Sequence, residues 1–165
     1  MLSVLRHRTY AQLFSAQVIA LLGTGLLTVA LGLLAFEIAG GEAGIVLGLA
    51  MTIKMVAYVV VSPIATALTA RLPRTPVLIT ADLIRAAVAL ALPFVTEAWQ
   101  IYVLIFLLQS ASATFTPTFQ AVIPSVLPDE KEYTQALSLS RLAYDLESLL
   151  SPPVSYTHLT LPTKA

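Results

Sequence analysis

Residues 13–36 read LFSAQVIALLGTGLLTVALGLLAF, an apolar run without a single charged side chain. About 20 such residues, each rising about 1.5 Å in a helix, cross a hydrocarbon core about 30 Å thick. A secretory signal has a shorter apolar run and a small-residue cleavage site, whereas this run is too long and further apolar blocks follow it. The stretch therefore predicts a membrane-spanning helix.

Similar apolar blocks fill most of the chain, and each is bounded by Gly, Pro or charged residues. A fifth block is shorter than the about 20 residues that a crossing needs. We therefore predict an all-α integral membrane fold with four complete transmembrane helices and a truncated fifth. The predicted spans are residues 12–36, 43–70, 77–94 and 99–123, and the short fifth segment is 136–152.

The composition excludes several classes of protein. Of 165 residues 58% are apolar and 11% are charged, which excludes a disordered chain and a soluble enzyme. Nine basic residues balance nine acidic ones, so we expect no nucleic-acid partner. The chain has no Cys and two His at opposite ends, so we expect no metal site and no cofactor. It also lacks an acid cluster, an H-E-x-x-H motif and a nucleophile elbow, so we expect no enzymatic activity.

The basic residues predict the orientation of the spans. Arg6 and Arg8 precede the first span, Arg71 and Arg74 lie between the second and third, and Lys131 follows the fourth. The loops after the first and third spans contain neither Lys nor Arg. Because Lys and Arg of short loops remain in the cytoplasm, we predict a multi-pass protein with a cytoplasmic N-terminus.

The end of the sequence differs in character from the rest. Residues 154–163 read VSYTHLTLPT, which resembles the in-frame translation of a transposon-end adapter used to prepare DNA sequencing libraries. We therefore expect residues 1–152 to be a natural fragment and residues 153–165 to be a non-native tail. This tail is expected to take no part in fold or function.

Four short motifs follow one another along the chain. Residues 63–75 read PIATALTARLPRT, 81–86 read ADLIRA and 116–130 read TPTFQAVIPSVLPDE, and Ser151-Pro152 lies in the fifth segment. In order and spacing they resemble the N-terminal half of a major facilitator superfamily transporter, in the bacterial branch that includes drug and siderophore exporters. The resemblance covers residues 5–152. The first motif departs from the family pattern, because Ala70 stands where that pattern has Asp.

This resemblance implies a function that the residues alone do not give. It implies a fragment of a secondary transporter in the bacterial cytoplasmic (inner) membrane, namely a proton-coupled efflux permease for a drug-like or siderophore-like small molecule. Substrate and protons would be its partners, together with the lipid bilayer, and the fragment alone would be inactive. The alternative is a small four-span membrane protein that acts as a structural or self-associating subunit.

Lys54 is the most informative candidate for a functional residue. It lies near the middle of the second span, where a charged group costs at least about 2.5–3.5 kcal/mol and usually serves function. Tyr58 follows at a four-residue step, so both side chains share one helix face. Lys54 either binds substrate or a coupling ion, or forms a structural pair with an acid of the fifth segment. Asp145 and Glu147 are the candidate acids.

Polar residues also recur at helical spacing in the first and fourth spans, which the resemblance places around the central cavity. We expect Gln109 and Thr116 on one polar stripe of the fourth span, and Gln17 and Thr24 on a weaker stripe of the first. The alternative is that the Thr hydroxyls only bond the preceding helical turn. In the fifth segment Arg141 and Asp145 have the spacing of an ion pair.

A second charged group lies near the predicted cytoplasmic side. Asp82 and Arg85 are three residues apart in the third span and therefore share a helix face. Together with Arg71 and Arg74 they form a predicted gate or charge cluster. The alternative role for Asp82 is proton coupling.

Overall fold

The computed structural model describes residues 2–150, and all regular elements in this part of the chain are helices. The five long helices are α1 (Arg8–Ala39), α2 (Ala43–Thr69), α3 (Arg74–Ala91), α4 (Ala98–Val126) and α5 (Glu130–Leu150). Short 3-10 helices cover Leu2–Arg6, Gly40–Glu42 and Leu92–Phe94. The Ser151-Pro152 motif and the predicted tail lie outside the described residues.

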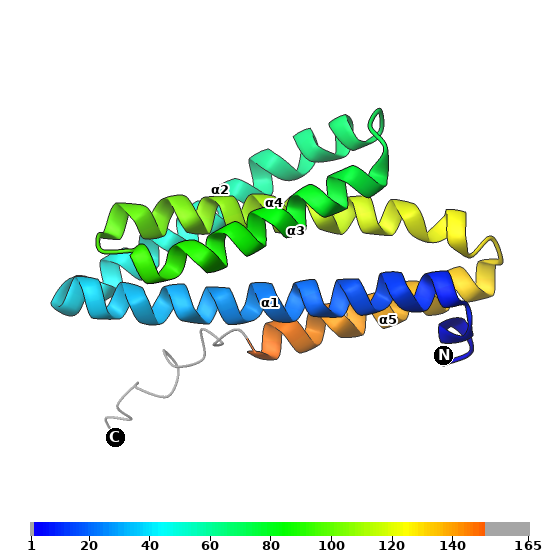
Figure 1. Ribbon diagram of the computed structural model, residues 1–165, viewed down its shortest axis with the longest axis horizontal. Helices are drawn as coiled ribbons and strands as arrows, with labels where there is room; N and C mark the ends of the chain where they lie inside the picture. Colours follow the sequence, from blue (N-terminus) through cyan, green and yellow to red (C-terminus); the bar gives the residue numbers. More distant parts are fainter. Residues whose placement is uncertain (1, 151–165) are drawn as a thin grey trace, which may run out of the picture.

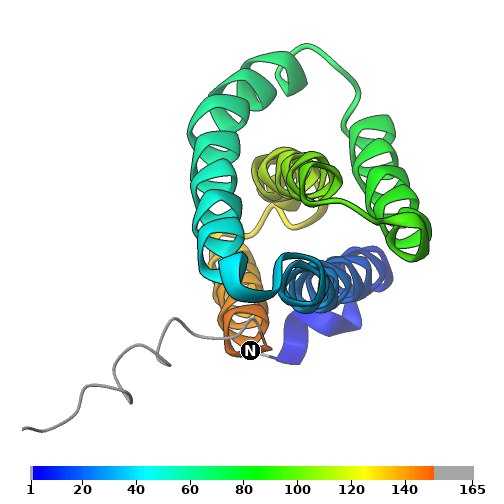
Figure 2. The ribbon, with the colours of Figure 1, turned by 90° about the vertical axis from the view of Figure 1, so that its left-hand side faces the viewer.

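Successive helices run in opposite directions along one long axis, so the odd-numbered helices begin at the same end of the bundle (Figure 1). α4 lies at the centre of the end view, between α1, α2 and α3 (Figure 2). α5 packs mainly against α1, beside α2. The bundle is therefore built around α4, and α5 closes one side of it.

The lengths of the helices fit a membrane protein. Three helical stretches are long and apolar enough to cross a bilayer, namely Arg8–Thr69, Arg74–Phe94 and Ala98–Val126. The first of these stretches contains both α1 and α2, which turn back on each other around Gly40. Gly40 has a φ of 51°, a conformation that glycine adopts without steric cost. α5 is not among these stretches within the described part of the chain. The predicted all-α membrane fold is confirmed.

Several helices begin earlier than hydropathy predicts. α5 begins at Glu130 instead of near residue 136, because the Asp129 carboxylate accepts bonds from the backbone N–H groups of Lys131 (2.8 Å) and Glu132 (3.3 Å). α3 begins at Arg74, directly after Pro73, instead of at residue 77. Both first turns are polar, so a search for apolar runs leaves them out.

Two groups of buried apolar residues hold the bundle together, one near each end. The first joins the N-terminal part of α1 to α4 and α5, with Tyr10, Phe115, Phe119 and Ile123 among its members. The second joins α1 to α2, α3 and α4 at the other end. Large apolar side chains such as Val59 (73% exposed) remain on the outside, as expected of helices whose outer surface meets lipid.

Candidate functional site

A cavity of about 330 Å³ lies where α1, α2, α4 and α5 meet. Each of these helices contributes polar residues to its wall: Thr28 from α1, Lys54 from α2, Gln109 from α4, and Glu147 and Ser148 from α5. The remaining wall is largely apolar and includes Met51 and other aliphatic side chains of α1, α2 and α4. Such a cavity, apolar with a few convergent polar groups, is typical of a small-molecule site.

Lys54 and Glu147 are the two opposite charges in this cavity. Both residues are half-buried, and the Glu147 carboxylate interacts electrostatically with Lys54 and Arg85. Their charged atoms lie more than 4.0 Å apart: within residues 2–150, basic and acidic side chains come closer than this only at His7–Glu132 and Asp82–Arg85. The ammonium and the carboxylate therefore face one cavity without closing it as a direct pair.

Hydrogen bonds hold α5 beside this cavity. The Ser140 hydroxyl donates to Gln17 Oε1 of α1 at 2.7 Å, and the Tyr144 hydroxyl donates to Thr116 Oγ1 of α4 at 2.8 Å. Gln17 and Ser140 are almost completely buried. The amide nitrogen of Gln17 and the hydroxyl of Ser112 have no hydrogen-bond partner among the described residues. The seam between α1, α4 and α5 is therefore polar and incompletely paired.

A second polar group surrounds Arg85 in the interior of the bundle. Its guanidinium forms an ion pair with Asp82 at 2.6 Å and donates through Nε to Thr24 Oγ1 at 3.0 Å. It also lies 4.7 Å from the centre of the Phe115 ring, which favours a cation. The pairing of Asp82 with Arg85 that the spacing predicts is present. Arg85 thus links α3 to α1 and α4.

Comparison with known proteins identifies the family. Residues 13–160 match the Major Facilitator Superfamily, which is most of the chain. The chain belongs to the major facilitator superfamily. Two relatives are named macrolide efflux protein A, one from Streptococcus pyogenes and one from its serotype M6, and each is 26% identical over 148 residues. The matched part is 87% of this chain but 36% of each relative, so it spans about a third of their length. No solved structure gives a significant match.

The structure of this superfamily member brings together only some of the predicted cavity residues. Lys54 and Gln109 line the cavity, whereas Thr116 does not line it and accepts a hydrogen bond from Tyr144. Asp145 is exposed, and no ion pair joins it to Arg141 in the described part of the chain, so the expected pair is wrong. The carboxylate that faces Lys54 is Glu147.

The other predicted cavity residues have different surroundings. Gln17 is bonded to Ser140, and Thr24 belongs to the Arg85 group instead of the cavity. The Thr24 hydroxyl also donates to the Ala20 carbonyl, as in the alternative interpretation. Tyr58 is 38% exposed, lies near Ser112 and Tyr144, and does not line the cavity.

The predicted gate cluster is not gathered in one place. Arg71 and Arg74 are exposed at the end of the bundle where α3 begins, and neither pairs with Asp82 in residues 2–150. Arg74 instead donates to the Ala121 carbonyl of α4 at 2.5 Å. Ala70, at the position where the superfamily motif has Asp, offers no carboxylate to either arginine. Arg85, by contrast, is buried.

Sequence reasoning named Glu147 of α5 as a candidate partner of Lys54 but missed Ser140 and Tyr144. Ser140, Tyr144 and Glu147 are spaced by four and three residues, so they lie on one face of the helix. This face contacts α1, α4 and the cavity, whereas Arg141 and Asp145 lie on another, exposed face. The spacing places Glu147 and Asp145 on different faces of the helix, but it does not indicate which face packs inward.

Proposed function

We propose that the chain is the N-terminal part of a proton-coupled efflux permease that exports a drug-like or siderophore-like small molecule. Membership of the superfamily and the macrolide efflux relatives support export. In this proposal the protein lies in the bacterial cytoplasmic membrane with its N-terminus in the cytoplasm. The arginines at the end where α1 and α3 begin support that orientation.

The observation that carries the proposal is the pair of opposite charges in the cavity between α1, α2, α4 and α5. Ionisable groups within membrane helices are costly and usually mark a substrate or proton pathway. Lys54 and Glu147 come from different helices and share a cavity wall with flexible methionines, which adapt to ligands of different shape. An amphipathic small molecule fits such a wall.

The chemistry of Glu147 supports proton coupling. A carboxylate that exchanges one proton with a cavity can change the charge of that cavity, and Lys54 responds to the change because the two groups interact. We propose that substrate binding and protonation compete at Glu147. A proton taken up from the outer side then moves inward as the substrate moves outward, while one half of the transporter rocks against the other.

The five described helices supply only part of such a transporter. Major facilitator transporters place their site between two six-helix halves. We therefore propose that the 165-residue chain alone does not transport. Cells that express only this chain should accumulate the same amount of substrate as cells with an empty vector, and a lower accumulation would refute this proposal.

The proposed function is tested with the full-length protein in a bacterium that lacks its own efflux pumps. Accumulation of compounds from a panel that includes macrolides is measured with and without a proton gradient. We expect expression to lower the accumulation of at least one compound, and dissipation of the gradient to abolish this effect. Glu147→Gln should abolish it as well, whereas the exposed neighbour Asp145→Asn should leave it intact. Gradient-independent export, or equal loss in both variants, would contradict the assigned role of Glu147.

A further inference from the structure

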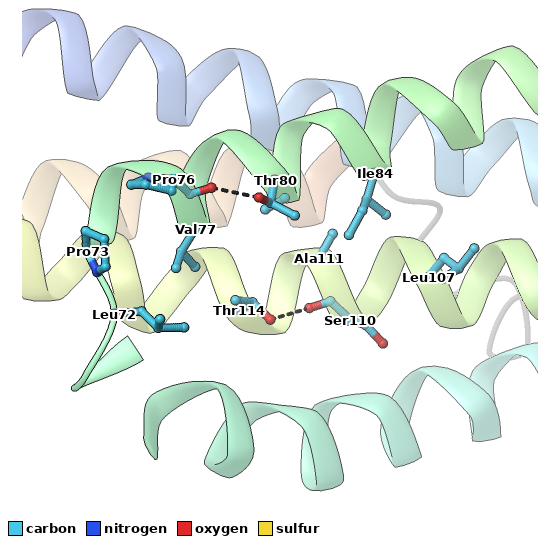
Figure 3. A pocket seen from close by; sticks show the side chains of 11 residues that line it. Leu72, Pro73, Pro76, Val77, Thr80, Ile84, Leu107, Ser110, Ala111 and Thr114 are labelled. Atoms are coloured by element: carbon cyan, nitrogen blue, oxygen red, sulfur yellow. Dashed lines mark hydrogen bonds between the residues drawn. The ribbon is translucent and has the colours of Figure 1, made fainter. Parts of the chain in front are cut away.

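A second and larger cavity, of about 430 Å³, lies between α3 and α4 (Figure 3). α3 contributes Pro76, Thr80 and Ile84 to its wall, and α4 contributes Leu107, Ala111 and Thr114. It does not share a lining residue with the Lys54 cavity. We call it the α3–α4 groove.

A separate, smaller cavity of about 200 Å³ is lined by Arg74, by Thr118 and Ala121 of α4, and by residues of α2. The α4 residues of both cavities recur every three or four positions from Leu107 to Ala121, so they form one stripe of that helix. The Arg74 guanidinium bonds the Ala121 carbonyl at the outer end of this stripe.

The hydroxyl groups along the groove do not make it polar. Thr80, Ser110, Thr114 and Thr118 each donate to a carbonyl oxygen of their own helix, at 2.7–2.9 Å. Figure 3 shows two of these bonds, from Thr80 to Pro76 and from Thr114 to Ser110. Because the donors are already used, the groove offers an occupant mainly methyl and methylene groups. An apolar chain fits it better than a polar solute.

The length of the groove indicates whether its occupant is a lipid tail or a protein helix. From Pro73 to Ile84 the α3 helix rises about 16 Å, which is about half of a 30 Å hydrocarbon core. Beyond that point α3 and α4 pack directly on each other through Val88, Leu104 and Leu108. A transmembrane helix would need a groove across the whole membrane, whereas a lipid tail needs one leaflet.

The charge at the groove mouth selects the headgroup. Leu72 and Pro73 line the mouth, and the exposed Arg71 and Arg74 flank them in the chain. Neither arginine has a carboxylate within 4.0 Å in the described part of the chain, while Asp82 is paired with Arg85. We propose that the α3–α4 groove binds an anionic phospholipid, with one acyl chain along α4 and the phosphate at Arg71 and Arg74.

The proposal is tested by fluorescence quenching with brominated lipids. The chain has one Trp, so Trp99→Phe gives a silent background into which a single reporter can be placed. Leu107→Trp puts the reporter at the inner end of the groove. Phe106→Trp is the matched control, since its side chain is 43% exposed at the same depth but does not line the groove. The full chain is reconstituted in vesicles in which brominated phosphatidylglycerol or brominated phosphatidylcholine replaces the unlabelled lipid.

We expect phosphatidylglycerol to quench the Leu107→Trp reporter at a lower mole fraction than phosphatidylcholine, by about fivefold for each arginine engaged. The Phe106→Trp reporter should respond equally to both lipids. Arg71→Gln with Arg74→Gln should remove the preference, whereas Arg6→Gln with Arg8→Gln, the same charge change at the same end of the bundle, should keep it. Equal quenching by both lipids at position 107 would overturn the headgroup assignment. Quenching of that reporter by neither lipid would show that protein fills the groove.

Discussion

Arg85 combines three kinds of interaction on one buried side chain. Its guanidinium faces the Asp82 carboxylate, the Thr24 hydroxyl and the Phe115 ring. A buried cation is costly unless it is paired and hydrogen-bonded. Each of these partners therefore stabilises the charge at its position between α1, α3 and α4.

Removal of one of these partners should measurably lower the stability of the protein. Thr24→Val keeps the side-chain shape but leaves Arg85 Nε without its acceptor, so we expect a loss of about 1–3 kcal/mol in the free energy of unfolding. Thr28→Val is the control, because the Thr28 hydroxyl bonds only the Thr24 carbonyl of the same helix. Thermal unfolding of the purified chain in detergent compares the two variants. Equal stability losses would show that the contact with Arg85 contributes nothing.

At the residue scale the sequence locates the charged side chains and their partners within one helix, but not their partners in other helices. Lys54 stands out because it interrupts an apolar run, and the Asp82–Arg85 pair follows from spacing within one helix. The choice of Glu147 over Asp145 depends on which face of α5 packs inward, which is a tertiary property. The contact between Thr24 and Arg85 joins two residues that are 61 positions apart in sequence, so local spacing does not predict it.

At the scale of elements, α5 is held by polar contacts more than the other helices are. Ser140 bonds Gln17 of α1, and Tyr144 bonds Thr116 of α4. The apolar contribution comes from small or medium side chains such as Ala136 and Leu139. Directional hydrogen bonds therefore set the position of α5 and, with it, that of Glu147 in the cavity.

Ser140→Ala should destabilise this docking. The buried Gln17 side chain, whose nitrogen already lacks a partner in residues 2–150, would also lose the partner of its oxygen. We expect a loss of about 1–3 kcal/mol. The control Ser138→Ala should change stability by less than about 0.5 kcal/mol, because Ser138 is exposed and bonds its own helix. If the Gln17–Ser140 bond is the cause, Gln17→Leu in the Ser140→Ala background should restore stability, and failure to do so would contradict this explanation.

Hydropathy predicts the existence of the helices better than their ends. The four apolar blocks correspond to α1–α4, because about 20 apolar residues specify a helix that can span a bilayer. Helix starts depend instead on caps such as Asp129, whose signal is one polar residue outside the apolar block. The arrangement of α2 and α3 around α4 comes from packing between distant segments and has no local signature.

At the scale of the whole molecule, the orientation in the membrane is a prediction that can be tested directly. The chain has no Cys, so a single introduced cysteine reports its own location. Gly41→Cys lies in the turn between α1 and α2, and Arg71→Cys lies in the loop between α2 and α3 at the other end. In intact cells a membrane-impermeant thiol reagent should label the first variant and should reach the second only after permeabilisation. The opposite labelling pattern would invert the proposed topology.

We propose that the full-length transporter handles its substrate or coupling ion in the cavity between α1, α2, α4 and α5. Lys54→Met keeps the aliphatic stem and removes the ammonium. Thr52→Met is the matched control, since Thr52 lies at nearly the same depth of α2 but is exposed and does not line the cavity. If Lys54 had only a structural role, Lys54→Met would lower the amount of folded protein. Adding Glu147→Gln to this variant would then restore that amount, whereas adding Asp145→Asn would not.

The most direct measurement is therefore export of a transported compound by the full-length protein with Lys54→Met, alongside the amount of protein in the membrane. We expect export to fall by at least about tenfold, the equivalent of about 1.4 kcal/mol, at an unchanged protein level. The Thr52→Met control should export normally. Full export by Lys54→Met at a normal protein level would show that the ammonium has no part in transport.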